Sequence, residues 1–177
     1  MNFNKVKIKM KKSTMFLASA VAAVALFFST NVNAQSSPKF GVGVNLGVPT
    51  NTGGSLAIGA DLRYQFDLDK QLSVPLTTGY TNISMKDSYG GGNFGYIPLK
   101  AGLKYFFNDT GSGAYGLAEA GAGFSTTSGG KTSFVYSPAI GYSWSNGLDL
   151  AAKYEGLSRD GSSNGYAGIR LAYGFKL

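Results

Sequence analysis

The sequence predicts an all-β protein: an eight-stranded, antiparallel, up-and-down transmembrane β-barrel that follows a cleaved signal peptide. Three observations favour this class. Apolar side chains alternate with small or polar ones in eight consecutive segments of about ten residues, the length of a tilted strand that crosses a bilayer. Aromatic residues gather at the ends of these segments on the apolar face, as in the girdles of membrane barrels. The last segment runs to the end of the chain, as closure of a barrel in lipid requires.

The first 34 residues have the three parts of a secretory signal peptide. Lysines at positions 5, 7, 9, 11 and 12 precede an apolar run at 15–28, and the small residue Ala34 stands before Gln35 at the expected cleavage site. The alternative is a membrane-spanning helix, but the apolar run has 14 residues and a span needs about 20. We therefore predict a signal peptide at 1–34, cleavage between Ala34 and Gln35, and a barrel domain at 35–177.

Composition excludes several function classes. The full chain has 16 basic and 9 acidic residues, but five of the lysines belong to the predicted signal peptide, so the basic balance is no sign of nucleic-acid binding. The sequence has no His and no Cys, which excludes a Ser-His-Asp triad and a Cys-His pair. We predict no catalytic residue, no cofactor and no metal site. Asp67 and Asp69 fit a solvated turn better than a calcium site.

The alternating segments are the predicted strands. They cover residues 39–48, 55–66, 71–81, 96–107, 114–125, 132–144, 148–157 and 165–177. The first shows the pattern clearly, because Val42 and Val44 alternate with Gly43 and Asn45. The fifth segment is ambiguous. We assign its even-numbered alanines to the apolar face because this choice keeps Glu119 off that face.

The connections between strands are rich in Gly, Asn, Asp and Ser, as tight turns require. We place both termini in the periplasm. The periplasmic turns are then 67–70, 108–113 and 145–147, and the outer loops are 49–54, 83–95, 126–131 and 158–164. Loop 83–95 is the longest and is where we first look for a surface partner. Prolines affect three strands: Pro98 fits a strand start, while Pro75 and Pro138 fit bulges or later strand starts.

The polar face of the strands distinguishes a membrane barrel from a soluble one. It carries mainly Gly, Ala and Ser with a few charges of both signs, which suits the narrow lumen of an eight-stranded barrel. A basic residue turned toward lipid instead costs roughly 2–4 kcal/mol at the bilayer midplane. We therefore predict a charge network in the lumen, which either plugs the barrel or lines a narrow conducting path. Its members are Asp61, Arg63, Lys100, Lys104, Glu119, Lys153, Glu155 and Arg170.

Three parts of the chain resemble a known family. They are the segment IPLKAGLKYFF at 97–107, the segment AGAGF at 120–124, and the C-terminal alternation. Together they are similar to the outer-membrane β-barrel domain proteins of Bacteroidetes and, more distantly, to the small OmpX- and OmpA-like barrels. The resemblance implies the fold and an outer-membrane location, with Tyr173, Phe175 and Leu177 as the signal read by the barrel-assembly machinery. Leu177 replaces the more usual terminal Phe. The resemblance implies no single activity.

We accordingly predict a non-enzymatic integral outer-membrane protein with a structural or surface-interaction role. Its expected partners are outer-membrane lipid, the barrel-assembly machinery and a surface partner at loop 83–95, with no nucleic acid. Two alternatives remain at this point. One is a small gated pore. The other is a soluble barrel that binds an apolar ligand, which needs the apolar face to line the cavity.

Overall fold

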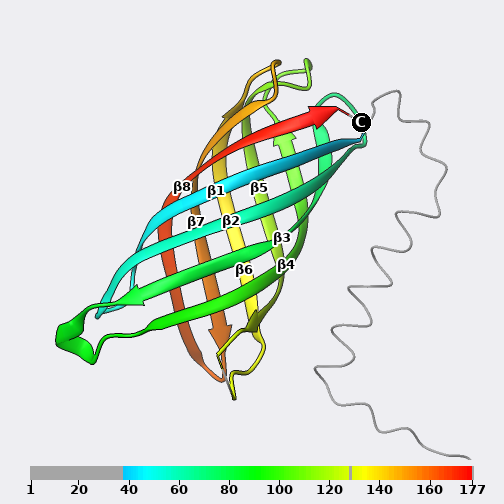
Figure 1. Cartoon of the computed structure of the whole chain (residues 1–177). Helices are drawn as coiled ribbons and strands as arrows, with labels where there is room; N and C mark the ends of the chain where they lie inside the picture. The colour runs from blue at the N-terminus through cyan, green and yellow to red at the C-terminus, as the bar shows by residue number, and fades with distance from the viewer. Residues whose placement is uncertain (1–37, 128, 177) are drawn as a thin grey trace, which may run out of the picture. The chain divides into compact units, whose positions relative to one another are not determined.

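The computed structural model describes residues 38–127 and 129–176. These residues form a closed barrel in which each strand pairs antiparallel with the next and β1 pairs with β8 (Figure 1). The strands are β1 (Lys39–Pro49), β2 (Gly54–Asp67), β3 (Leu72–Met85), β4 (Asn93–Phe106), β5 (Gly113–Ser125), β6 (Ser133–Ser143), β7 (Leu148–Arg159) and β8 (Ser162–Lys176). The predicted fold class is confirmed. The predicted signal peptide 1–34, its cleavage site at Ala34 and Gln35, and the terminal Leu177 lie outside the described residues.

The only helical element in the described ranges is the short 3-10 helix η1 (Asp87–Tyr89). None of the helical structure in these ranges is long and apolar enough to cross a membrane.

The strands turn their apolar side chains outward. In β1, Val42, Val44 and Leu46 are 44–57% exposed, whereas Asn45 between them is buried. The ambiguous β5 has the predicted orientation, with Glu119 buried inside and the alanines on either side of it exposed. This register is opposite to the one that a soluble barrel with an apolar cavity requires. Because side chains alternate across a strand, one register decides the environment of every residue in it.

The two ends of the barrel differ. We call one end the turn end: it holds the beginning of β1, the end of β8 and the connections 68–71, 107–112 and 144–147. We call the opposite end the loop end: it holds the connections 50–53, 86–92, 126–132 and 160–161. Outward-facing rings form contacting pairs at the turn end, with centroids 4.7–6.2 Å apart. The pairs are Tyr64–Phe66, Tyr105–Phe107, Tyr142–Trp144 and Tyr173–Phe175. Such a row of rings suits the boundary between lipid and water.

Three outer loops are shorter than predicted: 49–54 is reduced to 50–53, and two others change more. The loop predicted at 83–95 comprises only residues 86–92, because β3 continues to Met85 and β4 begins at Asn93. Loop 158–164 is a two-residue turn at Asp160 and Gly161, whose φ angles are 49° and 81°. Positive φ at both central residues matches the twist of the flanking strands, so the β7–β8 pairing extends to the turn. The Asp-Gly pair was the signal for this hairpin.

The interpretation of the prolines was wrong. Pro98 lies inside β4, five residues after its start, and neither Pro75 nor Pro138 causes a bulge. Pro75 pairs with Gln65 in β2, and β3 keeps the same register against β4 before and after it. Successive residues of an antiparallel strand direct their N–H groups to opposite neighbours, so a proline removes a donor on one side only. At Pro75 the pairing of β3 with β4 is interrupted while that with β2 is continuous, and at Pro138 the pairing of β6 with β7 is interrupted while that with β5 is continuous.

Candidate functional site

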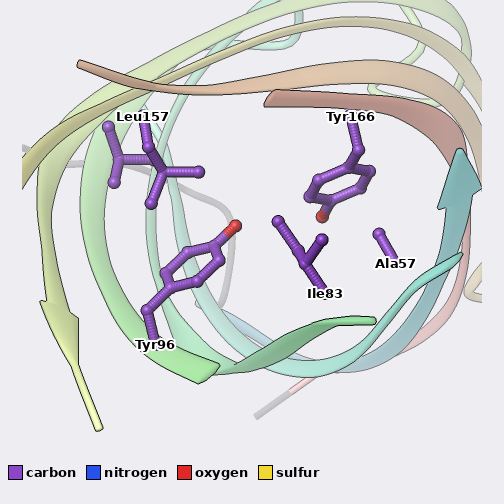
Figure 2. Packing of buried hydrophobic residues seen from close by; sticks show 6 residues of the cluster. Ala57, Ile83, Tyr96, Leu157 and Tyr166 are labelled. Carbon is purple, nitrogen blue, oxygen red and sulfur yellow. The ribbon is translucent and has the colours of Figure 1, made fainter. Parts of the chain in front are cut away.

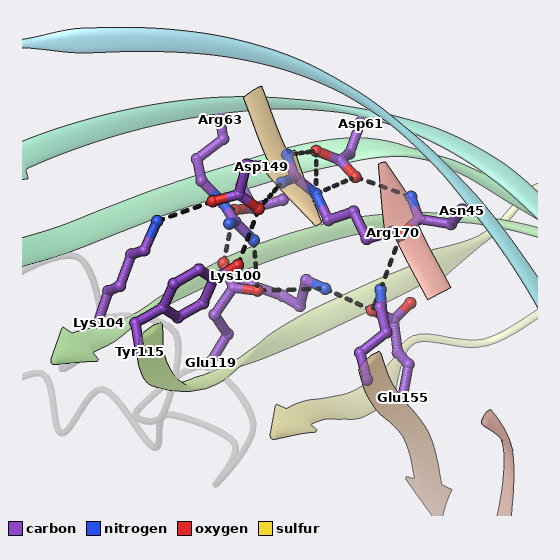
Figure 3. A network of polar contacts seen from close by, with 12 residues as sticks. Asn45, Asp61, Arg63, Lys100, Lys104, Tyr115, Glu119, Asp149, Glu155 and Arg170 are labelled. Carbon is purple, nitrogen blue, oxygen red and sulfur yellow. Dashed lines mark hydrogen bonds and ion pairs between the residues drawn. The ribbon is translucent and has the colours of Figure 1, made fainter. Parts of the chain in front are cut away.

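The lumen holds most of the charged residues of the strands, whereas Arg159 and Lys176 at strand ends are exposed. The inward positions of β2, β4, β5, β7 and β8 bring together all eight predicted network residues, and Figure 3 labels all of them except Lys153. Each of their side chains is at most 7% exposed. Alternation alone places them there, because their outward neighbours are apolar or small and face the outside of the barrel.

One part of the network centres on Arg170 of β8. Its Nη2 lies 2.6 Å from Oδ1 of Asp61, and its Nε donates to Oδ2 of the same carboxylate at 2.9 Å. Its Nη1 lies 3.4 Å from Oδ1 of Asp149, whose Oδ2 pairs with Nζ of Lys104 at 2.9 Å. The hydroxyl of Tyr115 donates to Asp149 at 2.8 Å. The two-point contact between Arg170 and Asp61 restricts both side chains to one geometry.

A second part centres on Glu119 of β5. Nη2 of Arg63 lies 3.1 Å from its Oε2, and the Thr77 hydroxyl donates to its Oε1 at 2.5 Å. Nε of Arg63 in turn donates to the Thr77 hydroxyl at 3.1 Å. Nζ of Lys100 lies 3.8 Å from Oε2. Both oxygens of this buried carboxylate therefore have partners, as burial of a charge requires.

A third part centres on Glu155 of β7. It accepts from the Tyr96 hydroxyl at 2.5 Å and from Nζ of Lys153 at 2.9 Å, and it also pairs with Lys100. Lys100 thereby links Glu155 to Glu119. Asn45 of β1 makes a second link, because it accepts from Lys153 at 3.3 Å and donates to Asp61 at 2.7 Å.

The charges inside the barrel nearly balance. Near the turn end, Asp67 lies in β2 at 8% exposure and pairs with Lys39 at 2.8 Å, so the prediction of a solvated turn at this residue was wrong. Deeper in the lumen, Arg63, Lys100, Lys104, Lys153 and Arg170 face four carboxylates, those of Asp61, Glu119, Asp149 and Glu155. Every one of these four carboxylates has a cationic partner within 3.1 Å. Removal of one partner from a buried pair leaves an uncompensated charge and destabilises the fold.

Apolar clusters pack against the network on both sides. Toward the loop end, Tyr96 and Tyr166 project into the lumen and pack with aliphatic side chains (Figure 2). The full cluster is Ala57, Ile83, Tyr96, Val135, Leu157 and Tyr166, with Phe94 packed against it. Toward the turn end, the cluster is Phe106, Tyr115, Leu117 and Ala151. Nζ of Lys104 lies 3.8 Å from the centroid of the Tyr115 ring, so a cation–π contact joins this cluster to the network.

Several network members were missed by the sequence reasoning. Asp149 is the fourth carboxylate, and its inward parity with Lys153 and Glu155 was the available signal. Asn45 and Thr77 also occupy inward positions and contact Asp61 and Glu119. Uncharged polar residues are common in strands, so the sequence did not indicate that these two would connect charged residues of the network. The phenol groups of Tyr96 and Tyr115 contribute as donors, although a tyrosine in a strand is usually assigned to an apolar face.

The two described residues of the predicted assembly signal lie on the outside of β8. Tyr173 and Phe175 are 45% and 49% exposed, and their ring centroids are 4.9 Å apart. They pair with Val42 and Phe40 across the closing seam between β8 and β1.

The chemistry of the lumen is that of packing and charge compensation. In the ranges that the structure describes, no group of three or more carboxylates is arranged to hold a metal ion. Among the buried polar side-chain atoms described, the hydroxyl of Tyr166 has no hydrogen-bond partner.

Comparison with known proteins establishes the fold. No protein-family model matches this sequence, and no curated protein matches it either. The attachment invasion locus protein Ail of Yersinia pestis is 19% identical, with a TM-score of 0.57 over 79% of this chain and 99% of Ail. The N-terminal barrel of Pseudomonas aeruginosa OprF is 17% identical, with a TM-score of 0.50 over 76% and 97% of the two chains. A de novo designed transmembrane β-barrel is 17% identical, with a TM-score of 0.52 over 80% and 98%. The chain therefore has the fold of the small eight-stranded membrane barrels.

Proposed function

We propose that this chain is a non-enzymatic integral outer-membrane barrel with a closed lumen and a structural or surface-interaction role. One observation carries the proposal: apolar side chains cover the outside, while a compensated charge network between two apolar clusters occupies the inside. Large apolar side chains are exposed on all eight strands, mostly Val, Leu and Ile, with Tyr80 and Met85 on β3 and Phe124 on β5. They would be unfavourable in water, but they match the hydrocarbon core and boundary of a bilayer.

The same packing opposes the pore alternative. A conducting path needs water along the lumen, whereas Tyr96, Phe106, Tyr115 and Tyr166 are at most 1% exposed. We expect no steady single-channel conductance from the reconstituted barrel. Reproducible, voltage-independent current steps would show that the lumen opens and would overturn the closed-lumen part of the proposal.

A surface role is the more specific part of the proposal. The Ail barrel, which has the same fold, has been crystallised with the heparin analogue sucrose octasulfate and studied in phospholipid nanodiscs. In this chain, the loop 86–92 and the connection 126–132 are equally long and are the longest at the loop end. Loop 86–92 presents Lys86, Asp87 and Tyr89, the last 61% exposed. We propose this loop as the contact site for a surface partner.

Assembly and export complete the proposal. The alternating Tyr173 and Phe175, followed by Leu177, would be read by the barrel-assembly machinery, and the residues 1–34 would direct export before cleavage between Ala34 and Gln35. The narrower assignment to the Bacteroidetes type rests on the motifs at 97–107 and 120–124. N-terminal sequencing of the mature protein tests the cleavage site directly, and a mature chain that begins at Met1 would overturn it.

The decisive experiment uses a washed outer-membrane fraction on a denaturing gel, with and without boiling. We expect the protein in that fraction, with a mobility that shifts on boiling, because a closed barrel resists detergent until it is heated. Recovery in the soluble periplasmic fraction without a shift would overturn the membrane location.

A further inference from the structure

The outer face of β3, which lies between β2 and β4 (Figure 1), carries two polar side chains away from the strand ends. These are Thr78 and Asn82. Each directly follows a residue of the lumen, Thr77 or Thr81, which are 3% and 4% exposed. Both share the outward parity of Tyr80, which is 46% exposed. A hydroxyl and an amide therefore face the outside of the barrel.

The surroundings of these two residues are apolar. Thr78 pairs with Leu62 of β2 and with Leu99 of β4, which are 45% and 56% exposed. Asn82 pairs with Ile58 of β2, which is 53% exposed. Because the strands on both sides present leucine to lipid beside Thr78, its hydroxyl lies within the apolar band of the barrel.

Neither polar side chain has a partner within the described barrel. No hydrogen bond or ion pair in residues 38–127 and 129–176 uses the side chain of Thr78 or Asn82. Elsewhere on the described strands, outward Asn, Ser and Thr side chains lie within two residues of a strand end, close to water. Hydrocarbon offers no hydrogen bond, so an amide and a hydroxyl held there are unfavourable unless a neighbouring protein pairs with them.

The backbone beside this face is also incompletely paired. The register between β3 and β4 is interrupted twice, at 74–75 and at 79–80, whereas no other seam of the described barrel is interrupted more than once. Prolines lie at both places, because Pro75 is in the first gap and the continued register puts Pro98 opposite Gly79 in the second. Polar side chains and a weakly paired seam thus coincide on one side of the wall.

We propose that this face of β3 is the contact surface of a homodimer in the membrane, formed with a second copy of this chain. Two copies inserted in the same direction place Thr78 and Asn82 at the same depth in the bilayer. A two-fold axis along the bilayer normal then brings each residue opposite its own counterpart. An amide and a hydroxyl both donate and accept hydrogen bonds, so each can pair with itself across this axis. This inference rests on the proposed membrane location.

The chemistry of the surface favours a second copy as the partner. Away from the strand ends, the outward residues of the other described strands are Gly, Ala, Pro, aliphatic or aromatic. A head-to-tail contact between β3 and one of those strands would leave the amide of Asn82 without a partner, whereas contact of β3 with β3 gives it both a donor and an acceptor. Such a pair also fixes the register of the contact, as one buried Asn does in a coiled coil.

The test is thiol crosslinking of the full barrel in the outer membrane. The sequence has no Cys, so an introduced thiol is the only one on the chain. Ser84→Cys places a thiol on the β3 face, two residues after Asn82. Ser158→Cys is the matched control, because both serines are outward, half-buried and second to last in their strands. With a flexible bismaleimide, we expect a product of twice the barrel mass from Ser84→Cys and little from Ser158→Cys.

Removal of the polar groups should separate the copies without harm to the barrel. In the Ser84→Cys background, Asn82→Leu with Thr78→Val should weaken dimerisation about tenfold, the scale of side-chain hydrogen bonds lost in a membrane. The new side chains suit lipid, so the mobility shift on boiling should persist in this variant and in both cysteine variants.

Equal crosslinking of the two cysteine variants would overturn the inference, and so would a double variant that crosslinks as Ser84→Cys does. A product of another mass would indicate a different membrane protein and would also overturn it. If the double variant loses the shift on boiling, the two cysteine variants decide the question by themselves. A folded barrel that stays monomeric in the outer-membrane fraction would refute this inference and leave the proposed function intact, whereas absence from that fraction would refute both.

Discussion

Replacement of Glu155 by Gln tests whether the lumen network stabilises the barrel. The substitution keeps the shape of the side chain and removes one negative charge. Glu155 is 1% exposed and holds Lys153 at 2.9 Å and the Tyr96 hydroxyl at 2.5 Å, in addition to Lys100. Without the carboxylate, Lys100 keeps Glu119 as its anionic partner, at 3.8 Å. Lys153 keeps the amide oxygen of Asn45 and a cation–π contact with Tyr166, and neither is an anion.

The magnitude follows from the uncompensated charge. Loss of one partner from a buried ion pair costs about 3–5 kcal/mol, because the remaining charge stays out of water without compensation. We expect Glu155→Gln to lower the free energy of unfolding by that amount, a large part of the 5–15 kcal/mol that is typical of a domain. Removal of the surplus cation should restore part of the loss, so the double variant Glu155→Gln with Lys153→Met should be more stable than Glu155→Gln alone.

The assay is equilibrium unfolding by urea of the barrel folded into lipid vesicles, followed by tryptophan fluorescence and by the gel-mobility shift. Asp87→Asn, on the exposed loop 86–92, is the control and should change stability by less than about 0.5 kcal/mol. If Glu155→Gln unfolds at the same urea concentration as the unmodified barrel, the network does not contribute to stability and the reasoning is wrong.

Three further predictions address the packing of the lumen. Arg63→Ala should lower the free energy of unfolding by about 3 kcal/mol or more because it leaves Glu119 short of a cation; unchanged urea resistance would argue against a structural plug. Tyr166→Phe should leave stability unchanged or raise it by about 1 kcal/mol, since it removes a buried hydroxyl without a partner, whereas Tyr115→Phe should lower it by about 1–2 kcal/mol; equal losses in the two variants would contradict the assignment. Gly121→Val should abolish the mobility shift on boiling, since a Cβ there would lie 2.9 Å from the Cα of Lys100 on the paired strand; a normal shift would show that the sheet can yield at this point.

Much of the architecture could be predicted from alternation alone. A period of two identifies a strand and assigns each residue to one of two faces, and the cost of charges in lipid decides which face is outside. For this reason the inward positions of Asp61, Glu119 and Arg170 were predictable. Proline effects were less predictable, because the consequence of Pro75 or Pro138 depends on which neighbouring strand would have accepted its hydrogen bond.

The sequence by itself therefore determined the number of strands, which face of each strand is outside, and most of the charges in the lumen, although Asp149 was missed. Only the tertiary structure decided which charges meet. Arg170 binds Asp61, 109 residues earlier, and Lys100 binds Glu155, 55 residues later. These partnerships depend on the register between neighbouring strands and on closure of β8 against β1, which together place side chains of distant strands at the same depth. Alternation along one strand does not say how far along the barrel axis its residues lie relative to those of another strand. The ion-pair partners could therefore be identified only from the closed barrel.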